Sequence, residues 1–355
     1  MINNKLTNPL SGGESKEPRQ SNLEALRIAA MLLVLLIHFA HAHCSPSADS
    51  LQHSPGQTIA NLCLRSISFV CVNCFILISG YFSIRWKPRS FFGFLFQVVF
   101  WLTLGTAMVK VFGFSQETSS LNACLSFVNG RWFVPAYIAL YIISPILNEF
   151  INNSQTKNLG RYVLCFYIFS TLFGYLLVSD EFNGGMSLIS LIGIYLTGAY
   201  LRREDSVFNR FSARQCFMSF SAIAVLLVVI STGLLTMGIS KSIFGYLNPL
   251  IIIQSVFLFL TFRNLKIGNI KYINWIAASA FAVYLFHMHP LIRPHYTLTC
   301  KWISDQGAYA PILVILFFIT IFIFCTLVDK VRIYIFDKVF KLISHKKVSL
   351  EISHR

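Results

Sequence analysis

The stretch that decides the fold is YAPILVILFFITIFIFCTLVD, residues 309–329, in which only the last residue is charged. About 20 predominantly apolar residues in a helix cross the hydrocarbon core of a bilayer. Nine further apolar runs lie along the chain, at residues 24–43, 59–82, 91–113, 132–150, 161–179, 186–201, 216–238, 243–262 and 275–293. The sequence therefore predicts an all-α, polytopic integral membrane protein with about ten transmembrane helices.

The composition excludes an ordinary water-soluble protein. Hydrophobic residues make up 55% of the 355 residues and charged residues only 12%, with 34 Phe and a mean hydropathy of +0.64. Soluble domains carry about 25% charged residues. We therefore expect membrane lipids to solvate most of the surface.

The formal charge of +15 reflects topology. Most of the 29 Lys and Arg residues lie in the two tails and in alternate connections between apolar runs, whereas residues 41–58 and 180–185 carry none. Because cytoplasmic segments are enriched in Lys and Arg, both termini are predicted to be cytoplasmic. We expect a tail at 1–22, a transmembrane domain at 23–330, a basic tail at 331–355, and no nucleic-acid partner.

Three local patterns have alternative interpretations. The first run, with Ala40-His41-Ala42, is similar to a signal peptide, but Glu24 and the later runs favour a retained helix. Cys71 and Cys74 form a C-x-x-C inside an apolar run, where helix packing is favoured over redox or metal chemistry. Residues 114–130 are expected to form a re-entrant or interfacial segment.

Arg27 and His38 share the first predicted helix. Eleven residues place them about 16 Å apart along the axis and, after three turns, on one face. Arg27 would lie at the cytoplasmic interface and His38 about halfway across the core. An imidazole at this depth can serve as a general base, or can be a structural group bonded to a neighbouring backbone.

A second polar group follows the second run. Ser79-Gly80-Tyr81 precedes Arg85, Lys87 and Arg89 at the predicted cytoplasmic boundary. One guanidinium group can donate hydrogen bonds to two phosphate oxygens at once, so this cluster could hold a phosphate. It could equally be an ordinary basic cytoplasmic loop.

The third group lies in the ninth run, where Tyr284-Leu285-Phe286-His287 precedes His289. His287 and Arg65 are predicted at similar depth in the outer half of the membrane, where they could line a polar cavity. The two histidines lack a third ligand, so we predict no metal site. No carboxylate is expected at mid-depth, which disfavours a proton-coupled transporter.

These motifs together resemble acyltransferase family 3, bacterial membrane O-acyltransferases of surface polysaccharides, over residues 20–330. That family carries an Arg or Lys, ten residues, and then His in its first helix, as Arg27 and His38 do here. Further similarities are Ser79-Gly80-Tyr81, Arg85 to Arg89, Trp132-Phe133 with Tyr141 and Ser144-Pro145, and Tyr284 to His287. Glu24 stands where the family usually has Asp. Many members also carry a fused extracytoplasmic domain. If the acceptor requires such a domain, we expect a separate extracytoplasmic partner protein to supply it here.

The resemblance implies transfer of an acyl group from cytoplasmic acyl-CoA, most often acetyl-CoA, to a polysaccharide or lipid-linked glycan. It implies the bacterial cytoplasmic (inner) membrane and no permanently bound cofactor. His38 would be the catalytic residue, as a general base or as carrier of the acyl group, oriented by a hydroxyl, an amide or the backbone. Donor-binding candidates are Arg27, Arg85, Lys87 and Arg89, and acceptor-side candidates are Arg65, Trp132, Tyr284 and His287.

The main alternative is a protein without acyl-transfer activity. An exporter or flippase of a polysaccharide or lipid-linked glycan would also line a passage with polar residues. It would tolerate changes at Arg27 and His38 that keep the passage polar, whereas an enzyme would not tolerate loss of His38.

Overall fold

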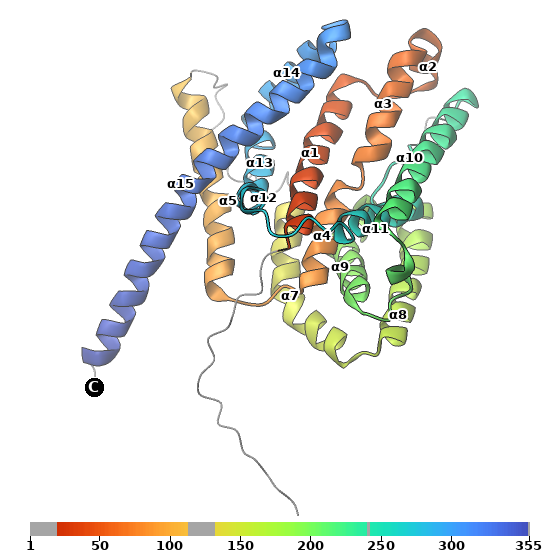
Figure 1. The fold of residues 1–355 in the computed structure, drawn as a ribbon. Coiled ribbons are helices and arrows are strands. Elements are labelled where there is room, and N and C mark those ends of the chain that lie inside the picture. Colours follow the sequence, from red (N-terminus) through yellow and green to blue (C-terminus); the bar gives the residue numbers. More distant parts are fainter. Residues whose placement is uncertain (1–19, 113–131, 240–241, 354–355) are drawn as a thin grey trace, which may run out of the picture.

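The computed structural model describes residues 20–112, 132–239 and 242–353, with side chains up to residue 343 (Figure 1). Every regular element in these ranges is a helix, so the predicted all-α class is confirmed. The expected re-entrant segment at 114–130 lies outside the described residues.

The elements follow one another in this order. The first part of the chain forms α1 (Ser21–His43), α2 (Ala48–His53), α3 (Pro55–Ser68), α4 (Cys71–Phe82), α5 (Pro88–Val111), α7 (Phe133–Asn153), α8 (Thr156–Phe169), η1 (Ser170–Leu176) and η2 (Asn183–Gly185). The second part forms α9 (Leu188–Arg202), η3 (Val207–Arg210), α10 (Ala213–Thr236), α11 (Pro249–Arg263), α12 (Lys271–Ala277), α13 (Ala280–His287), α14 (Arg293–Ser304), η4 (Gly307–Tyr309) and α15 (Ala310–Ser353).

Seven helical segments of the described chain are long and apolar enough to cross a membrane. They are Ser21–His43, Pro55–Phe82, Pro88–Val111, Phe133–Asn153, Thr156–Leu176, Ala213–Thr236 and Gly307–Ile343. α9 and α11 are apolar but have only 15 residues each. The predicted ninth helix is instead divided into α12, α13 and the start of α14, with Pro290, which has no N–H to donate, in the second break. The count of ten crossings remains a prediction.

α1 is the central helix of the bundle. It contacts α3, α4, α11, α12, α13 and α14 (Figure 1). Leu26, Ala30 and Leu35 on this helix have no exposed surface. A polar residue on this buried face of α1 therefore meets other protein segments, and we expect its contacts to be specific.

α4 packs against α9 through glycine. A Cβ atom on Gly80 would lie 2.0 Å from the carbonyl oxygen of Tyr195, and one on Gly198 would lie 2.3 Å from that of Leu77. Small residues allow two membrane helices to bring their backbones together. The glycine of the Ser79-Gly80-Tyr81 motif thus has a packing role.

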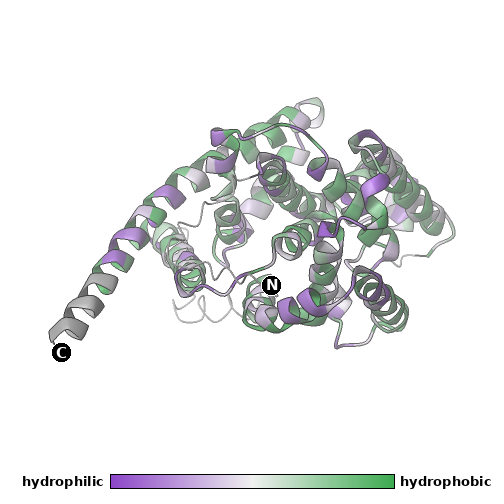
Figure 2. Cartoon of the chain, turned by 60° about the horizontal axis from the view of Figure 1, so that its bottom comes forward, coloured by the Kyte–Doolittle hydropathy of each residue, from purple (hydrophilic) through white to green (hydrophobic). Residues whose placement is uncertain are grey.

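α15 is the longest helix, with 44 residues and a length of about 66 Å, roughly twice the apolar core of a bilayer. The carboxylate of Asp329, which is fully buried, fastens it to α5. Asp329 accepts hydrogen bonds from Gln97, Trp101 and Arg332. Figure 2 shows hydrophilic residues in the connections and at intervals along the coloured part of α15.

Candidate functional site

His38 of α1 meets His287 of α13. Their nitrogens, Nδ1 of His38 and Nε2 of His287, are 3.0 Å apart, and the ring centroids are 5.1 Å apart. Nδ1 of His287 lies 2.6 Å from the carbonyl oxygen of Val283, one turn earlier on α13. The sequence predicted a hydroxyl, amide or backbone partner for His38, and at Nδ1 the structure shows the imidazole of His287.

The order of these contacts determines the tautomers of both rings when they are neutral. The carbonyl of Val283 can only accept, so Nδ1 of His287 carries the proton of that ring. Nε2 of His287 is then an acceptor, and Nδ1 of His38 must donate to it. The remaining nitrogen of His38, Nε2, bears the lone pair and is the basic atom of the pair.

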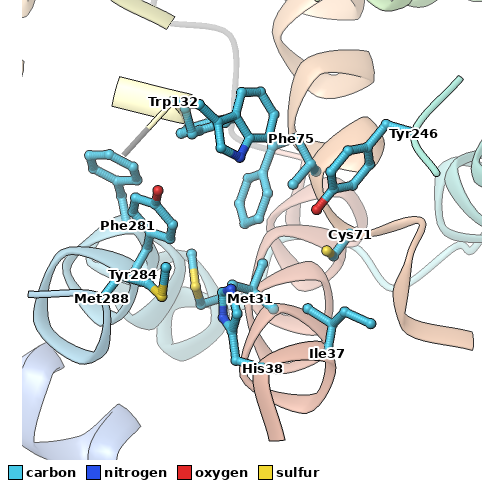
Figure 3. A pocket seen from close by; sticks show the side chains of 13 residues that line it. Met31, Ile37, His38, Cys71, Phe75, Trp132, Tyr246, Phe281, Tyr284 and Met288 are labelled. Carbon is cyan, nitrogen blue, oxygen red and sulfur yellow. The ribbon is translucent and has the colours of Figure 1, made fainter. Parts of the chain in front are cut away.

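His38 lines a narrow cavity inside the bundle (Figure 3). The cavity has a volume of about 70 Å³, which is enough for several water molecules. Its lining residues are Met31, Val34, Ile37, His38, Cys71, Val72, Phe75, Trp132, Phe133, Tyr246, Phe281, Tyr284 and Met288. Two predicted acceptor-side residues, Trp132 and Tyr284, are therefore beside His38. Tyr246, Met31 and Cys71 were not singled out from the sequence as site residues.

One stripe of α1 joins the cavity to Arg27. Met31, Val34 and His38 line the cavity and follow Arg27 by four, seven and eleven residues. This spacing keeps all four residues on one helix face. The structure thus places Arg27 on the line that leads to His38.

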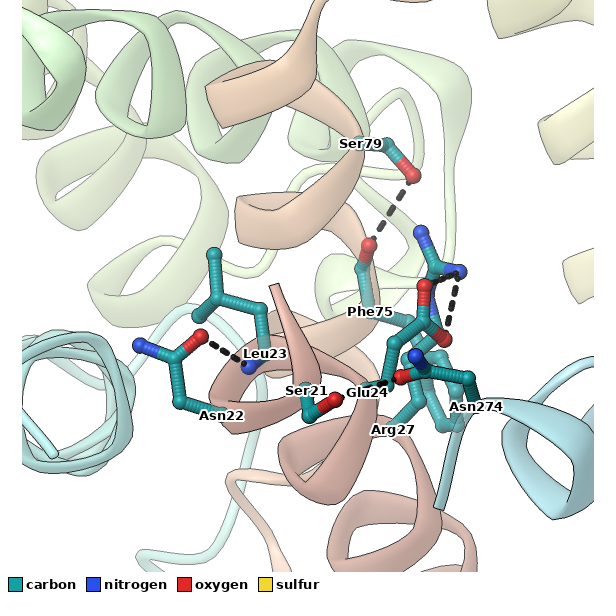
Figure 4. A network of polar contacts seen from close by, with 8 residues as sticks. All are labelled: Ser21, Asn22, Leu23, Glu24, Arg27, Phe75, Ser79 and Asn274. Carbon is teal, nitrogen blue, oxygen red and sulfur yellow. Dashed lines mark hydrogen bonds and ion pairs between the residues drawn. The ribbon is translucent and has the colours of Figure 1, made fainter. Parts of the chain in front are cut away.

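Arg27 lies at the other end of this stripe and pairs with a carboxylate. Its Nη1 is 3.1 Å from Glu24, and its side chain is 36% exposed. Its charge also acts on Tyr137 of α7, whose hydroxyl is 3.3 Å from Ser79 Oγ. The Ser79 hydroxyl donates to the carbonyl of Phe75 (Figure 4). Phe75 is one of the residues that line the cavity. The polar end of α1 is therefore next to the α4 wall of the cavity.

The connection between α4 and α5 is held by side chains of α7 and α9. The N–H of Ile84 donates to the Tyr195 hydroxyl at 2.9 Å, and Asn148 donates to the Ile84 carbonyl at 2.7 Å. The Tyr195 hydroxyl in turn donates to Asn148. Tyr141 donates to the carbonyl of Arg85 at 3.2 Å. These bonds fix the backbone that carries the predicted phosphate-binding residues.

The three cations of this connection differ in their contacts. Arg85 and Lys87 are exposed. Arg89 instead forms a 2.7 Å ion pair with Asp337 of α15 and lies over the ring of Phe340. A ligand phosphate at Arg89 would therefore compete with Asp337.

Arg65 lies apart from the His38 cavity. Its Nε donates to Asn61, and its Nη2 donates to the carbonyl of Cys44 just beyond the end of α1. Arg65 lines a second pocket, shared with Ser231 of α10. The sequence suggested that Arg65 and His287 could line one polar cavity. Arg65 lines this second pocket, whereas the buried side chain of His287 is in the lining neither of it nor of the His38 cavity.

The two histidines of the ninth run point to different partners. His289 Nε2 lies 3.1 Å from the carbonyl of Leu102 on α5, and a Cβ on Gly105 would clash with its ring. His287 turns instead to His38. No group of three potential metal ligands occurs among the described residues.

The cysteine pair is buried in helix packing. Cys71 and Cys74 on α4 are both free thiols with almost no exposed surface. Cys71 faces the His38 cavity, whereas Cys74 lies 4.0 Å from the carbonyl of Ser255 on α11.

Comparison with known proteins gives one match. A family model described as an acyltransferase domain matches residues 20–329, which include every residue of the site described above except those of α15 beyond 329. No curated protein and no solved structure matches the chain.

Proposed function

The chain belongs to acyltransferase family 3, and from that premise we propose that it is a membrane O-acyltransferase using cytoplasmic acyl-CoA. The acceptor is a hydroxyl of a surface or lipid-linked polysaccharide, and the acyl group is acetyl. The family itself accounts for an acyltransferase activity and a multi-pass membrane protein. The donor, the acceptor and the acyl group are our proposal.

The proposed topology has ten crossings, with both termini in the cytoplasm of a bacterium and the protein in the inner membrane. The distribution of Lys and Arg supports this orientation. Arg27 and the connection that carries Arg85 then face the cytoplasm, and the outer end of α1 faces the opposite side. One helix thus leads from the donor side to His38.

The donor site is proposed at the cytoplasmic end of the α1 stripe. Arg27, Arg85, Lys87 and Arg89 supply positive charge for the phosphates of CoA, which cations bind by charge-assisted hydrogen bonds. The acyl-bearing arm would follow the stripe of Met31 and Val34 to His38. The apolar walls of the cavity suit an acyl thioester.

The chemistry is proposed at Nε2 of His38. This nitrogen takes the proton of the acceptor hydroxyl while the hydroxyl oxygen attacks the thioester carbonyl carbon. The new C–O bond forms, the C–S bond breaks, and the proton passes to the departing CoA thiolate. His287 holds Nδ1 of His38 and positions the ring throughout. In a two-step variant, Nε2 attacks the thioester carbonyl, the C–S bond breaks and CoA leaves as its thiolate. The acceptor hydroxyl then attacks the acyl-imidazole, the N–C bond breaks, and the hydroxyl proton passes to the thiolate.

The observation that carries this proposal is the His38–His287 pair, 3.0 Å apart, at the end of the stripe that begins at Arg27. It gives a basic nitrogen inside an apolar cavity, joined to a cationic helix end. General base catalysis of this kind contributes about 10²–10⁴-fold to a rate.

The test is transfer of radiolabel from acetyl-CoA in membranes that contain the wild-type protein, His38→Ala or His53→Ala at matched levels. His53 is an exposed histidine paired with Asp49, so its substitution controls for loss of an imidazole elsewhere. We expect labelled glycan from wild type and His53→Ala and none from His38→Ala. Label on wild-type protein itself would select the two-step variant.

Two outcomes would overturn the proposal. Equal labelling by His38→Ala and wild type would remove His38 from the chemistry. Movement of glycan across the membrane without acyl transfer from any acyl-CoA would make the protein an exporter.

A further inference from the structure

A second pocket lies at the other end of α1, among α3, α10 and the connection that precedes α11. The pocket has a volume of about 40 Å³, which is enough for more than one water molecule. Its walls include Leu62, Phe244 and the polar side chains of Arg65, Ser231 and Ser242. Arg65 is 8% exposed and Ser231 is 6% exposed.

Arg65 has unused hydrogen-bonding capacity in this pocket. A guanidinium offers five N–H groups, and the protein partners of Arg65 are Asn61 at 2.7 Å and the Cys44 carbonyl at 3.0 Å. No carboxylate of the described residues pairs with it. A buried cation without a counter-charge is costly, which favours an anion in the pocket.

Ser231 is a second, independent sign of a ligand. Its Oγ is buried, lines the same pocket, and has no hydrogen-bond partner among the described residues. A buried hydroxyl without a partner costs free energy, which a bound acceptor atom would recover. Arg65 and Ser231 together offer a charge and a hydroxyl to one ligand group.

The charge of the pocket comes from Arg65. The other residues that line it are apolar or carry uncharged hydroxyl groups. A cleft with charge of one sign attracts ligands of the opposite sign, so the pocket favours an anion over a cation.

An aromatic wall separates the pocket from the His38 cavity. The ring of Phe69 lies 5.7 Å from Phe244, which lines the pocket, and 5.4 Å from Tyr246, which lines the cavity. Cys44, whose carbonyl Arg65 holds, is six residues beyond His38, or about 9 Å along a helix axis. One or two sugar residues span this length, so a glycan that lies along the rings of Phe69, Phe244 and Tyr246 would reach both sites.

We propose that Arg65 and Ser231 form an anion subsite for a carboxylate or phosphate group of the acceptor glycan. The charged group binds at Arg65, the sugar lies along Phe69, Phe244 and Tyr246, and its hydroxyl reaches His38. The acceptor is thus an acidic glycan. This inference rests on the proposed function, because it places the acceptor on the side of the membrane opposite the donor.

The test measures binding of three probes to the purified full-length protein in detergent: methyl glucuronide, glucose 1-phosphate and methyl glucoside. We expect at least one of the two anionic probes to bind about tenfold or more tightly than the neutral methyl glucoside. The stronger anion identifies the group as carboxylate or phosphate. Equal binding of all three probes, or of none, overturns the proposal.

Variants at Ser231 separate binding from folding, since Arg65 also holds the end of α1 and its removal endangers the fold. Ser231→Ala should weaken anion binding about tenfold without lowering the unfolding temperature, because its hydroxyl has no partner to lose. Ser231→Asp should place a carboxylate beside Arg65 and abolish anion binding. Ser206→Ala is the matched control, because Ser206 is also buried with an unpartnered Oγ but lies outside this pocket.

The outcomes distinguish this inference from the proposed function. Unchanged anion binding in both Ser231 variants would overturn the subsite, whether or not acetyl-CoA still labels a glycan. Conversely, anion binding lost in Ser231→Asp would sustain the subsite even if acyl transfer from acetyl-CoA failed.

Discussion

The α4–α9 interface and the α1–α13 interface are built in opposite ways. Between α4 and α9, Gly80 and Gly198 let backbone meet backbone, with no room for one added carbon. Between α1 and α13, two imidazoles meet at 3.0 Å beside a cavity. The molecule thus brings two backbones together where side chains are absent, and places two imidazoles beside a cavity where side chains fill the interface.

α4 connects these two interfaces. One of its faces packs on α9, while Cys71 and Phe75 on another face line the His38 cavity. A change in the α4–α9 spacing would therefore move a wall of the cavity. The glycines of the first interface support the geometry of the second.

The largest effect is expected from Gly80→Ala, which tests the close packing of α4 against α9. The new Cβ would lie 2.0 Å from a backbone oxygen of α9, so the two helices must separate. Overpacking of this kind costs about 1–3 kcal/mol or more of folding free energy. The measurement is the temperature at which half the protein is lost from the monodisperse peak in size-exclusion chromatography.

Gly233→Ala on α10 is the control for Gly80→Ala. Nothing lies within 4 Å of a Cβ at Gly233, so the substitution should stabilise the helix by about 1 kcal/mol. Similar unfolding temperatures for the two variants would show that α4 and α9 do not pack as closely as described.

An effect of similar size, but on rate alone, is expected from His287→Ala at the α1–α13 interface. Nδ1 of His38 loses its acceptor, so we expect kcat to fall about 10²-fold with an unchanged KM for acyl-CoA. His287→Gln, whose amide oxygen can accept from Nδ1 of His38, should recover part of the rate. Steady-state kinetics with varied acceptor concentration provide the measurement. A raised acceptor KM with normal kcat would instead make His287 an acceptor-binding residue, as its sequence context suggested.

A smaller effect than that of His287→Ala is expected from a substitution near the cytoplasmic end of the α1 stripe. Arg85→Gln should raise the KM for acyl-CoA about tenfold, the loss of one charged hydrogen bond, without changing kcat. Arg161→Gln, at another exposed basic position, should leave the KM unchanged. If neither substitution changes the KM for acyl-CoA, Arg85 does not bind the donor, and the donor site is limited to Arg27 and its neighbours.

The smallest effect is expected from Asp337→Asn, which releases Arg89 from its ion pair. An exposed pair contributes less than about 1 kcal/mol to stability, so the unfolding temperature should hardly move. The KM for acyl-CoA should fall about twofold, because the phosphate no longer competes with Asp337. If the KM is unchanged in Asp337→Asn and in Arg89→Gln, Arg89 serves only to hold α15.

The sequence was sufficient where helix geometry acts alone. The eleven-residue spacing of Arg27 and His38 predicts one face of one helix, and the cavity-lining positions of Met31 and Val34 between them are consistent with that face. Apolar run length likewise predicted most of the long helices. Both inferences need only the rise and the period of a helix.

The sequence was insufficient where distant segments meet. His38 and His287 are 249 residues apart, and Arg89 and Asp337 are 248 apart, so no local pattern specifies either pair. The ninth run also read as one continuous helix, because apolar composition does not reveal where α13 ends. Its break at Met288–Pro290 places His289 beyond the end of α13, where its Nε2 meets the carbonyl of Leu102 on α5.

The apolar lining of the cavity has a consequence for the energised membrane. A pair of imidazoles joined to water on both sides would conduct protons and dissipate the proton-motive force. Here the cavity beside His38 is lined by Phe75, Phe133, Phe281 and Met288, and it has room for only a few waters. Such apolar walls limit the water that can carry protons to and from His38.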